Sequence, residues 1–288
     1  MRLALIGTGL IGGSLAAAWR DAGLIDHVVA CDRSFDACER AQAMGVADAC
    51  ATSPAAAVAD ADWVLVAVPV GAMAEVFVQI APALRANAIV TDVGSTKASV
   101  MAAARQHLGP AFPRYVPAHP IAGGELPGVE HSSPTLFAGK LAITTPGIET
   151  DPTALDTMEA AWRAIGSRVL RMSAADHDQV FAAVSHLPHL LAFALVARIA
   201  SEPDAEAKLG FAGAGFRDFT RIAASSPVMW RDICLANRTA LSTELAAYRG
   251  LLDELQLALD AGDAERLEAS FELASRTRRR FGAGWDSE

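Results

Sequence analysis

The stretch GTGLIGGS at residues 7–14, which follows the short apolar run Leu3–Ile6, decides the predicted fold. A glycine at the first position permits a tight turn, the second lets a phosphate approach the backbone, and the third permits close packing of a helix on a strand. The free N–H groups at a helix start attract phosphates. We therefore predict a dinucleotide site whose backbone contacts come from Gly7, Gly9, Leu10, Ile11 and Gly12.

An acidic residue stands where such a site needs one. Asp32 ends the next predicted strand, Val28–Cys31, twenty positions after Gly12. Its carboxylate is expected to bind the adenosine ribose hydroxyls and to repel a 2′-phosphate, which favours NAD. Arg33 follows directly, and its guanidinium can bind that phosphate, so some use of NADP stays open.

Apolar runs alternate with helical stretches through the first 173 residues, which predicts a parallel sheet covered on both faces. Strands are expected at 3–6, 28–31, 63–68 and 88–91, and helices at 12–21, 35–44, 72–84 and 96–107. The runs 116–118, 141–144 and 168–172 are expected to extend that sheet. The predicted fold class is α/β, a doubly wound Rossmann-type parallel sheet followed by an all-helical domain.

The pattern changes after Ala174, where we find no convincing strand. One long helix is expected over 176–200, bent at Pro188, with shorter helices at 219–223 and 227–237 and a loop around Lys208. Leucines, with Tyr248 among them, then recur at steps of four and three from Leu241 to Leu259, and Asp263 is expected to cap the last helix. The seam fits packing within a subunit or across a dimer. We predict a dinucleotide-binding domain at 1–173 and a helical domain at 174–288 that supports a homodimer.

Composition narrows the classes of partner. The net charge of -9 argues against nucleic acid. The segment 179–197 lacks Asp, Glu, Lys and Arg, but its histidines, serine and proline favour a buried helix over a membrane span. The four cysteines form no CxxC pair and no metal spacing, which predicts reduced thiols and a cytoplasmic location. A strand that begins at Leu3 is expected to leave no room for a signal peptide.

Two polar segments follow predicted strands. In VTDVGSTK (90–97), Ser95 is either a helix cap or a hydroxyl beside the nicotinamide, and Lys97 is expected to be a solvated charge. In HPIAGGE (119–125), His119 follows a strand whose carboxyl end should face the cofactor crevice. A histidine at that place can accept a proton near neutral pH.

Two further segments carry polar groups in apolar surroundings. In SHLPH (185–189), His186 and His189 share one helical side, either as satisfied core histidines or as site residues. No HExxH motif or acidic or cysteine ligand stands at a diagnostic spacing, so we predict no metal. In GFRDFTRIAASSPVMW (215–230), Arg221 suits bidentate capture of a carboxylate or an interdomain ion pair.

These five segments, in this order, resemble the prephenate/arogenate (cyclohexadienyl) dehydrogenase family, the oxidative decarboxylases of tyrosine biosynthesis. The combination of HPIAG with a later SHLPH is specific, because most dinucleotide enzymes do not share it. The resemblance implies NAD-dependent oxidation with loss of CO2, to 4-hydroxyphenylpyruvate from prephenate or to tyrosine from arogenate.

The resemblance also implies roles for residues. His119 would accept the proton of the substrate's ring hydroxyl while hydride leaves the same carbon for NAD, and Ser95 would steady His119. His189 would position substrate and cofactor, and Arg221 would hold a substrate carboxylate. The supporting neighbours implied by the family are Ser185 and His186, with an acidic shell of Glu125, Asp178 and Asp218 near the pocket mouth.

The sequence leaves the substrate open. A pocket acid such as Glu125 or Asp178 could favour the ammonium of arogenate over the keto acid of prephenate. Two other classes remain as alternatives. The first is a β-hydroxyacid-type NAD(P) dehydrogenase, which typically uses a lysine base on its helical domain, where this chain offers only Lys208. The second is a non-catalytic dinucleotide-binding protein, against which the histidines in an apolar helix speak.

Overall fold

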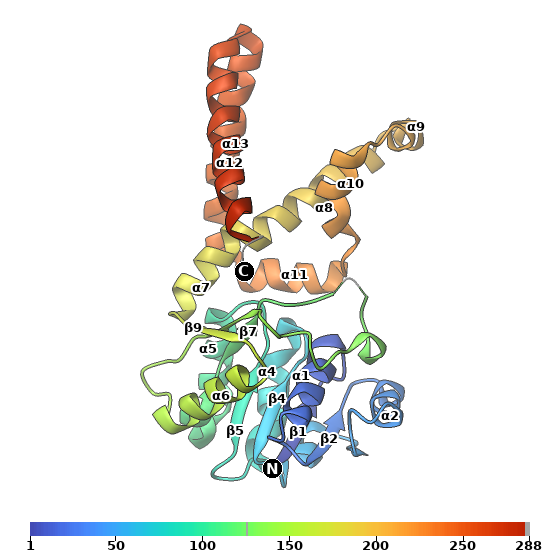
Figure 1. Ribbon diagram of the computed structural model, residues 1–288, viewed down its shortest axis with the longest axis vertical. Coiled ribbons are helices and arrows are strands. Elements are labelled where there is room, and N and C mark those ends of the chain that lie inside the picture. The colour runs from blue at the N-terminus through green and yellow to red at the C-terminus, as the bar shows by residue number, and fades with distance from the viewer. Residues whose placement is uncertain (125, 286–288) are drawn as a thin grey trace. The chain divides into compact units, whose positions relative to one another are not determined.

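The computed structural model describes residues 1–124 and 126–285, with side chains to residue 280. The chain divides into two compact units, Met1–Arg238 and Thr239–Glu288. The first unit contains a sheet between layers of helices and, after it, a run of further helices (Figure 1). The predicted boundary at 173/174 differs from this division and stays a prediction.

The main sheet has six parallel strands in the order β3-β2-β1-β4-β5-β6. The strands are β1 (Arg2–Ile6), β2 (His27–Cys31), β3 (Ala49–Cys50), β4 (Trp63–Val66), β5 (Ile89–Asp92) and β6 (Tyr115–Val116). This strand order reverses beside β1 and is the order of a doubly wound dinucleotide fold. The predicted fold class is confirmed, and β3 is a strand that the sequence pattern did not predict.

Alternation along the strands explains why both faces of the sheet are covered. In β1, Leu3 and Leu5 join one buried cluster, whereas Ala4 and Ile6 join the other. The first cluster includes side chains of α1 (Leu10–Asp21), α2 (Phe35–Ala43) and α6 (Pro152–Ala164). The second includes side chains of α3 (Pro54–Val58), α4 (Val70–Ile80) and α5 (Ala98–His107). Because each strand buries both faces, its sequence is almost continuously apolar.

Three strands predicted to extend the main sheet form a sheet of their own. It consists of β7 (Ala118–Pro120), β8 (Leu141–Thr144) and β9 (Arg168–Arg171), with β7 antiparallel to β8. The expectation is therefore wrong beyond Val116. Pro117 has no N–H for the ladder, and the N–H of Ala118 donates to the Asp92 carboxylate at 3.3 Å, so the backbone leaves the main sheet at this point.

A continuous helical segment over 174–200 confirms the predicted long helix. It consists of α7 (Ala174–Phe181), the π-helical turn η4 (Ala182–His186) and α8 (Leu187–Ala200). Pro188 lacks an N–H and its ring crowds the carbonyl four residues earlier, which accounts for the widened turn. By length and composition this helix could cross a membrane, and 28% of its most apolar window is buried. The helix was predicted to be buried, and in the structure only part of its apolar surface is buried.

Shorter helices complete the first unit. They are α9 (Ala205–Gly210), α10 (Ala214–Thr220) and α11 (Pro227–Ala236), with the 3₁₀ turns η1 (Ala81–Ala83), η2 (Gly109–Arg114), η3 (Val129–His131) and η5 (Arg221–Ala224). The loop predicted around Lys208 is wrong, because AEAKL consists of good helix formers. The second unit holds α12 (Arg238–Ala261) and α13 (Ala264–Trp285). Asp263 caps α13 as predicted, since its Oδ1 accepts the N–H of Arg266 at 3.0 Å.

The cysteines depart from the predicted four free thiols. Cys38 of α2 and Cys50 of β3 form a disulfide with Cα atoms 5.9 Å apart, and Cys31 and Cys234 are free. The pair is separated by twelve residues, a spacing that carries no motif. Only the packing of α2 beside β3 brings the two sulfur atoms together.

Candidate active site

The glycine loop has the geometry that its sequence predicts. Gly7 has φ +100°, and a Cβ there would lie 2.5 Å from the carbonyl oxygen of Ala67. A Cβ on Gly12 would lie 2.3 Å from the carbonyl oxygen of Gly7. Around Gly9, in contrast, a Cβ would meet no atom of the described chain within 4 Å. The first and third glycines therefore fit the protein tightly, whereas the second faces open space.

The start of α1 presents free backbone donors. Gly9 is its N-cap residue and supplies no side-chain hydrogen bond, so the first N–H groups of the helix, at Leu10 and Ile11, have no partner within the helix. Asp32 directly follows β2 and lies beside the loop, where its Oδ2 accepts the N–H of Thr8 at 2.8 Å. The arrangement fits a dinucleotide, with phosphates at the helix start and a ribose at Asp32. Arg33 is exposed next to it.

The loop after His119 lies against this helix start. A Cβ on Gly124 would lie 3.1 Å from Cδ2 of Leu10, and Ala122 packs against the same core cluster as α1. The HPIAGGE segment therefore borders the dinucleotide loop. Glu125, predicted to contact substrate, lies outside the described residues.

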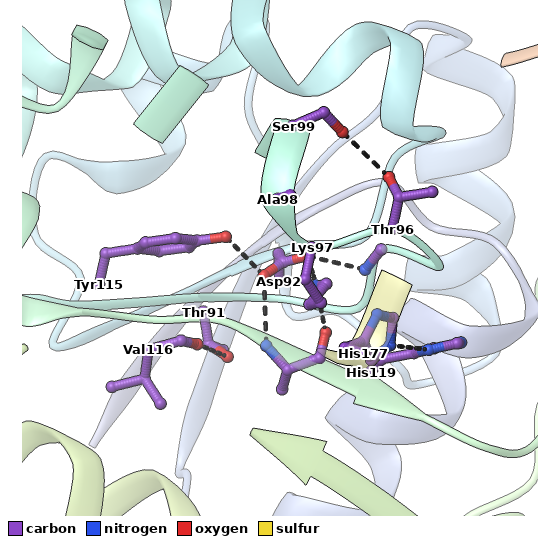
Figure 2. A network of polar contacts seen from close by, with 12 residues as sticks. Thr91, Asp92, Thr96, Lys97, Ala98, Ser99, Tyr115, Val116, His119 and His177 are labelled. Carbon is purple, nitrogen blue, oxygen red and sulfur yellow. Dashed lines mark hydrogen bonds and ion pairs between the residues drawn. The ribbon is translucent and has the colours of Figure 1, made fainter. Parts of the chain in front are cut away.

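A buried ion pair anchors the backbone in front of His119. Nζ of Lys97 lies 2.5 Å from Oδ2 of Asp92 and 2.6 Å from the carbonyl oxygen of Ala118, and both side chains are fully buried (Figure 2). Burial lowers the pKa of Lys97, and the Asp92 carboxylate opposes that shift. The expectation of a solvated lysine is therefore wrong. The ammonium ties β5 to the first residue of β7, immediately before the candidate base.

The same carboxylate holds a second strand. The hydroxyl of Tyr115 donates to Oδ1 of Asp92 at 2.7 Å, and the N–H of Gly94 donates to Oδ2 at 2.7 Å. Burial, followed by the charge of Asp92, raises the pKa of Tyr115 well above its usual value, so the phenol stays protonated. Asp92 thus organises the loop that carries Ser95 as well as the start of β7.

His119 is the first member of a chain of three polar side chains. Its Nδ1 lies 2.8 Å from Nε2 of His177, and Nδ1 of His177 lies 2.8 Å from Oδ1 of Asp178. The Phe181 ring packs against both imidazoles, with ring centroids 4.9 and 4.5 Å away. His177 is fully buried, whereas His119 is partly exposed. Figure 2 shows the two imidazoles side by side.

Asp178 joins the helical segment to the loop before α5. Its Oδ1 accepts the N–H of Lys97 at 2.7 Å and its Oδ2 accepts the N–H of Ala98 at 2.9 Å, which caps α5. Burial acts to raise the pKa of Asp178, but hydrogen bonds from His177, Lys97 and Ala98 lower it overall. The expectation that Asp178 stands in an acidic shell at the pocket mouth is wrong, because both oxygens are engaged and the side chain is buried.

His119 and His177 are neutral at physiological pH. Burial, then the neighbouring His177 and Lys97, holds the pKa of His119 well below its ordinary value. Burial also lowers the pKa of His177, against the opposing effect of Asp178. A neutral imidazole at position 119 has one nitrogen free to accept a proton.

His186 is a buried residue that is hydrogen-bonded to Asn237. Its Nδ1 accepts a hydrogen bond from Nδ2 of Asn237 at 3.0 Å, and Nδ2 also donates to the carbonyl oxygen of Asp178 at 2.7 Å. Burial lowers the pKa of His186 to about 4, while the backbone of Ser95 acts in the opposite direction. This histidine is only 1% exposed, so it belongs to the buried core.

His189 lies on the more open side of the helix. Its Nδ1 donates to the carbonyl oxygen of Ser185 at 2.9 Å, and its ring stacks on Trp230 at 3.6 Å between centroids. Burial lowers the pKa of His189, and the nearby charge of Arg221 lowers it further. Arg221 begins η5 and is exposed. The structure therefore makes His189 and Arg221 electrostatic neighbours.

Sequence reasoning missed His177 and Asn237. An HD pair at the start of a long apolar helix was a signal that could have pointed to His177, whereas Asn237 carried none. Ser95 is half-buried, and the predicted contact of its hydroxyl with His119 stays a prediction. The roles of the predicted site residues likewise stay predictions.

The fold and site define a class: a dinucleotide-dependent oxidoreductase whose sheet domain is completed by a helical segment carrying histidines. Comparison with known proteins then gives the family. The family model for the prephenate dehydrogenase nucleotide-binding domain matches residues 15–171, and the model for the prephenate dehydrogenase dimerization domain matches residues 173–273. This chain belongs to the prephenate dehydrogenase family, and the predicted resemblance is confirmed.

Relatives match over nearly the whole chain. The cyclohexadienyl dehydrogenase of Zymomonas mobilis is 35% identical over 280 residues, which cover 96% of this chain and 94% of that protein. The prephenate dehydrogenase of Aquifex aeolicus, solved with hydroxyphenyl propionate and NAD+, has a TM-score of 0.89 and 34% identity and covers 97% of this chain and 98% of its own. Synechocystis arogenate dehydrogenase has a TM-score of 0.81 and 27% identity, with coverage of 98% and 100%.

Proposed function

We propose that this chain catalyses the NAD-dependent oxidative decarboxylation of prephenate, arogenate or both, in the synthesis of tyrosine. Membership of the family makes the chain an NAD-dependent dehydrogenase, which sets aside the non-catalytic and β-hydroxyacid alternatives. The observation that carries the assignment of His119 is its place: it lies in the segment that borders the dinucleotide loop, with one nitrogen tied to His177.

The residues that would hold the cofactor are those of the glycine loop and the end of β2. Gly9 leaves space for the pyrophosphate, Leu10 and Ile11 offer N–H groups, and Asp32 accepts ribose hydroxyls. When bound, NAD supplies an acceptor for the hydride that leaves the substrate carbon. A comparison of kcat/KM for NAD and NADP tests the predicted preference, and a clear preference for NADP would contradict it.

The chain's own residues orient the substrate and hold a proton. Nε2 of His119 accepts the proton of the ring hydroxyl, as a positioned general base does. His189, held against Trp230, contacts substrate and cofactor beside Ser185. Arg221 binds a substrate carboxylate through its guanidinium fork. Because loss of CO2 makes the ring aromatic, the enzyme needs mainly orientation and a base.

The choice between the two substrates depends on the substrate side chain. Of the two acidic residues predicted to attract the ammonium of arogenate, Asp178 has both oxygens engaged. Glu125 is the remaining proposal for that role. Its replacement by Gln should lower kcat/KM for arogenate more than for prephenate, and an equal change for both would remove the proposal.

The decisive assay uses purified protein, NAD and each substrate in turn, followed by NADH absorbance and CO2 release. Turnover of at least one substrate with equal amounts of NADH and CO2 is expected. Tight NADH binding without turnover of either would refute the proposed function.

The carboxylate contact has its own test. Arg221→Ala should mainly raise KM, because it removes a contact that substrate and transition state share. Arg198→Ala is the matched control, since Arg198 lies on α8 and forms an exposed ion pair with Glu202, which follows that helix. An unchanged KM in Arg221→Ala would show that another residue holds the carboxylate.

We also propose that two copies of the chain associate through the helical region. The matched dimerization-domain model supports this, as do large apolar side chains on α12 and α13 that are exposed in one chain, such as Leu259 and Phe271 at 61% and 60%. Sedimentation of the wild type should give a dimer, and a Leu259→Glu substitution should weaken it. A monomer at micromolar concentration would contradict the proposal.

Location in the cytoplasm is a further proposal, supported by the need for NAD and opposed by the Cys38–Cys50 disulfide. Thiol titration of protein isolated under alkylating conditions tests it. Four reactive thiols after unfolding indicate a reducing compartment, and two indicate an oxidising one.

A further inference from the structure

We propose that His177 is a positioning residue that fixes the tautomer of His119, with Asp178 as its anchor. This inference rests on the proposed function, because it assumes that His119 accepts the substrate proton. It assigns a role to the buried pair His177 and Asp178, which contacts the candidate base His119 through one imidazole nitrogen.

The argument begins at Asp178. Its two oxygens accept the N–H groups of Lys97 and Ala98, which already favours the ionised carboxylate. An ionised carboxylate can only accept hydrogen bonds, so the proton between Asp178 and His177 must be on Nδ1 of His177. A neutral His177 then has no proton on Nε2.

The same rule applies to the next hydrogen bond, between His177 and His119. Nε2 of His177, as an acceptor, lies 2.8 Å from Nδ1 of His119, so Nδ1 of His119 must carry the proton. Nε2 of His119 is then left with its lone pair. The anchored carboxylate therefore decides, through two imidazoles, which nitrogen of His119 can act as a base.

The surroundings keep this chain in one state. His177 is fully buried and held between the Phe181 ring and His119. The titratable or charged groups that act on the pair are Lys97, Asp92, Asp178 and His186. Because Lys97 is bound to Asp92 and His186 to Asn237, none of these groups competes for Nε2 of His177.

The arrangement also balances the proton during the reaction. His119 takes the hydroxyl proton on Nε2 as the substrate carbon loses a hydride to NAD+, and its Nδ1–H then donates to His177 with the charge of Asp178 behind it. Breakage of the bond to the carboxylate releases CO2, and its electron pair makes the ring aromatic with a phenolate oxygen. That oxygen takes back the proton from His119, so no proton is gained or lost overall.

Two substitutions separate positioning from structure. His177→Gln places an amide oxygen where Nε2 stood and can still accept from His119, whereas His177→Leu has a similar volume and no acceptor. His107→Gln, at the opposite end of α5 from the site, is the matched control. We expect kcat to fall about 10- to 100-fold in His177→Leu, the range seen when a group that orients a metal-binding histidine is removed. His177→Gln should recover most of that loss.

Two readouts would not follow from a merely structural role. KM and the Kd for NADH should change little in either variant, because the His177 side chain is fully buried. Nitrogen-15 NMR of the imidazoles should show His119 protonated at Nδ1 in the wild type and in His177→Gln, but at Nε2 in His177→Leu. The NMR assignment needs no turnover, so it tests the tautomer even if the proposed substrates are wrong.

The inference is overturned if wild-type His119 carries its proton on Nε2. It is also overturned if His177→Leu keeps the wild-type kcat while His119→Asn is inactive. If His177→Leu does not fold, wild-type and His177→Gln spectra still decide. Failure of the wild type to oxidise either substrate would refute the proposed function instead.

Discussion

Within the same unit, the glycine loop and the histidine chain formed by His119, His177 and Asp178 differ in how their polar groups are used. The loop works through missing side chains: Gly9 leaves space for a ligand, and α1 leaves its first N–H groups uncapped. The histidine chain works through complete satisfaction, since Nδ1 of His119, both nitrogens of His177 and both oxygens of Asp178 have partners. Ligand binding at the loop thus requires hydrogen-bond donors without partners, whereas proton transfer requires one free acceptor among groups whose other hydrogen bonds are fixed.

The largest expected effect is at His119. His119→Asn should lower kcat/KM by about 10²- to 10⁴-fold, the usual contribution of a general base. The Kd for NADH should stay unchanged, because the glycine loop is untouched. His131→Asn, an exposed histidine of η3, is the control. A kcat/KM of His119→Asn close to the wild-type value would mean that the histidine chain does not take part in catalysis.

The second largest effect is expected at the buried Lys97–Asp92 ion pair, and it concerns the free energy of unfolding. Lys97→Met leaves Asp92 buried without its cation, which should cost about 3–5 kcal/mol in the free energy of unfolding. Denaturant titration measures this cost. A loss below about 1 kcal/mol, as for exposed ion pairs, would mean that the pair is solvated in solution.

The pH dependence of stability probes the buried histidine beneath the site. The folded-state pKa of His186 is about 4, below the ordinary 6.5, so folding favours the neutral form. Its contribution is complete above pH 6.5 and is lost as pH falls from 6.5 toward 4, with a total of about 3 kcal/mol.

Unfolding titrations at several pH values test this sign. His119 and His177 add changes in the same direction, so the measure is the difference between the wild type and His186→Gln. That difference should shrink as the solution is acidified through this window. A difference that is independent of pH would show that His186 titrates normally.

The smallest effects compare two glycines of one loop. Gly9→Ala should weaken NADH binding about tenfold, or about 1.4 kcal/mol, with an unchanged Tm, because its Cβ enters only the ligand space. Gly12→Ala should instead lower stability by about 1–3 kcal/mol, because its Cβ meets the carbonyl of Gly7. Equal effects of both substitutions on Tm would contradict the division of roles.

Local patterns predicted much of the fold correctly. The alternation of Leu3, Ala4, Leu5 and Ile6 between two cores is a property of any strand with both faces buried, so composition and period were sufficient. The departure of the chain at Pro117 was not predicted, because it depends on Asp92 taking the N–H of Ala118.

Short motifs are sufficient to identify the family, the dinucleotide loop and the candidate base, since they act through backbone geometry and residue type. The state of that base depends on contacts between distant parts of the chain. Asp178 lies 81 residues from Lys97 in the chain, and His177 lies 58 from His119. Burial of such distant groups against one another selects their charges and tautomers, and no local pattern records that selection.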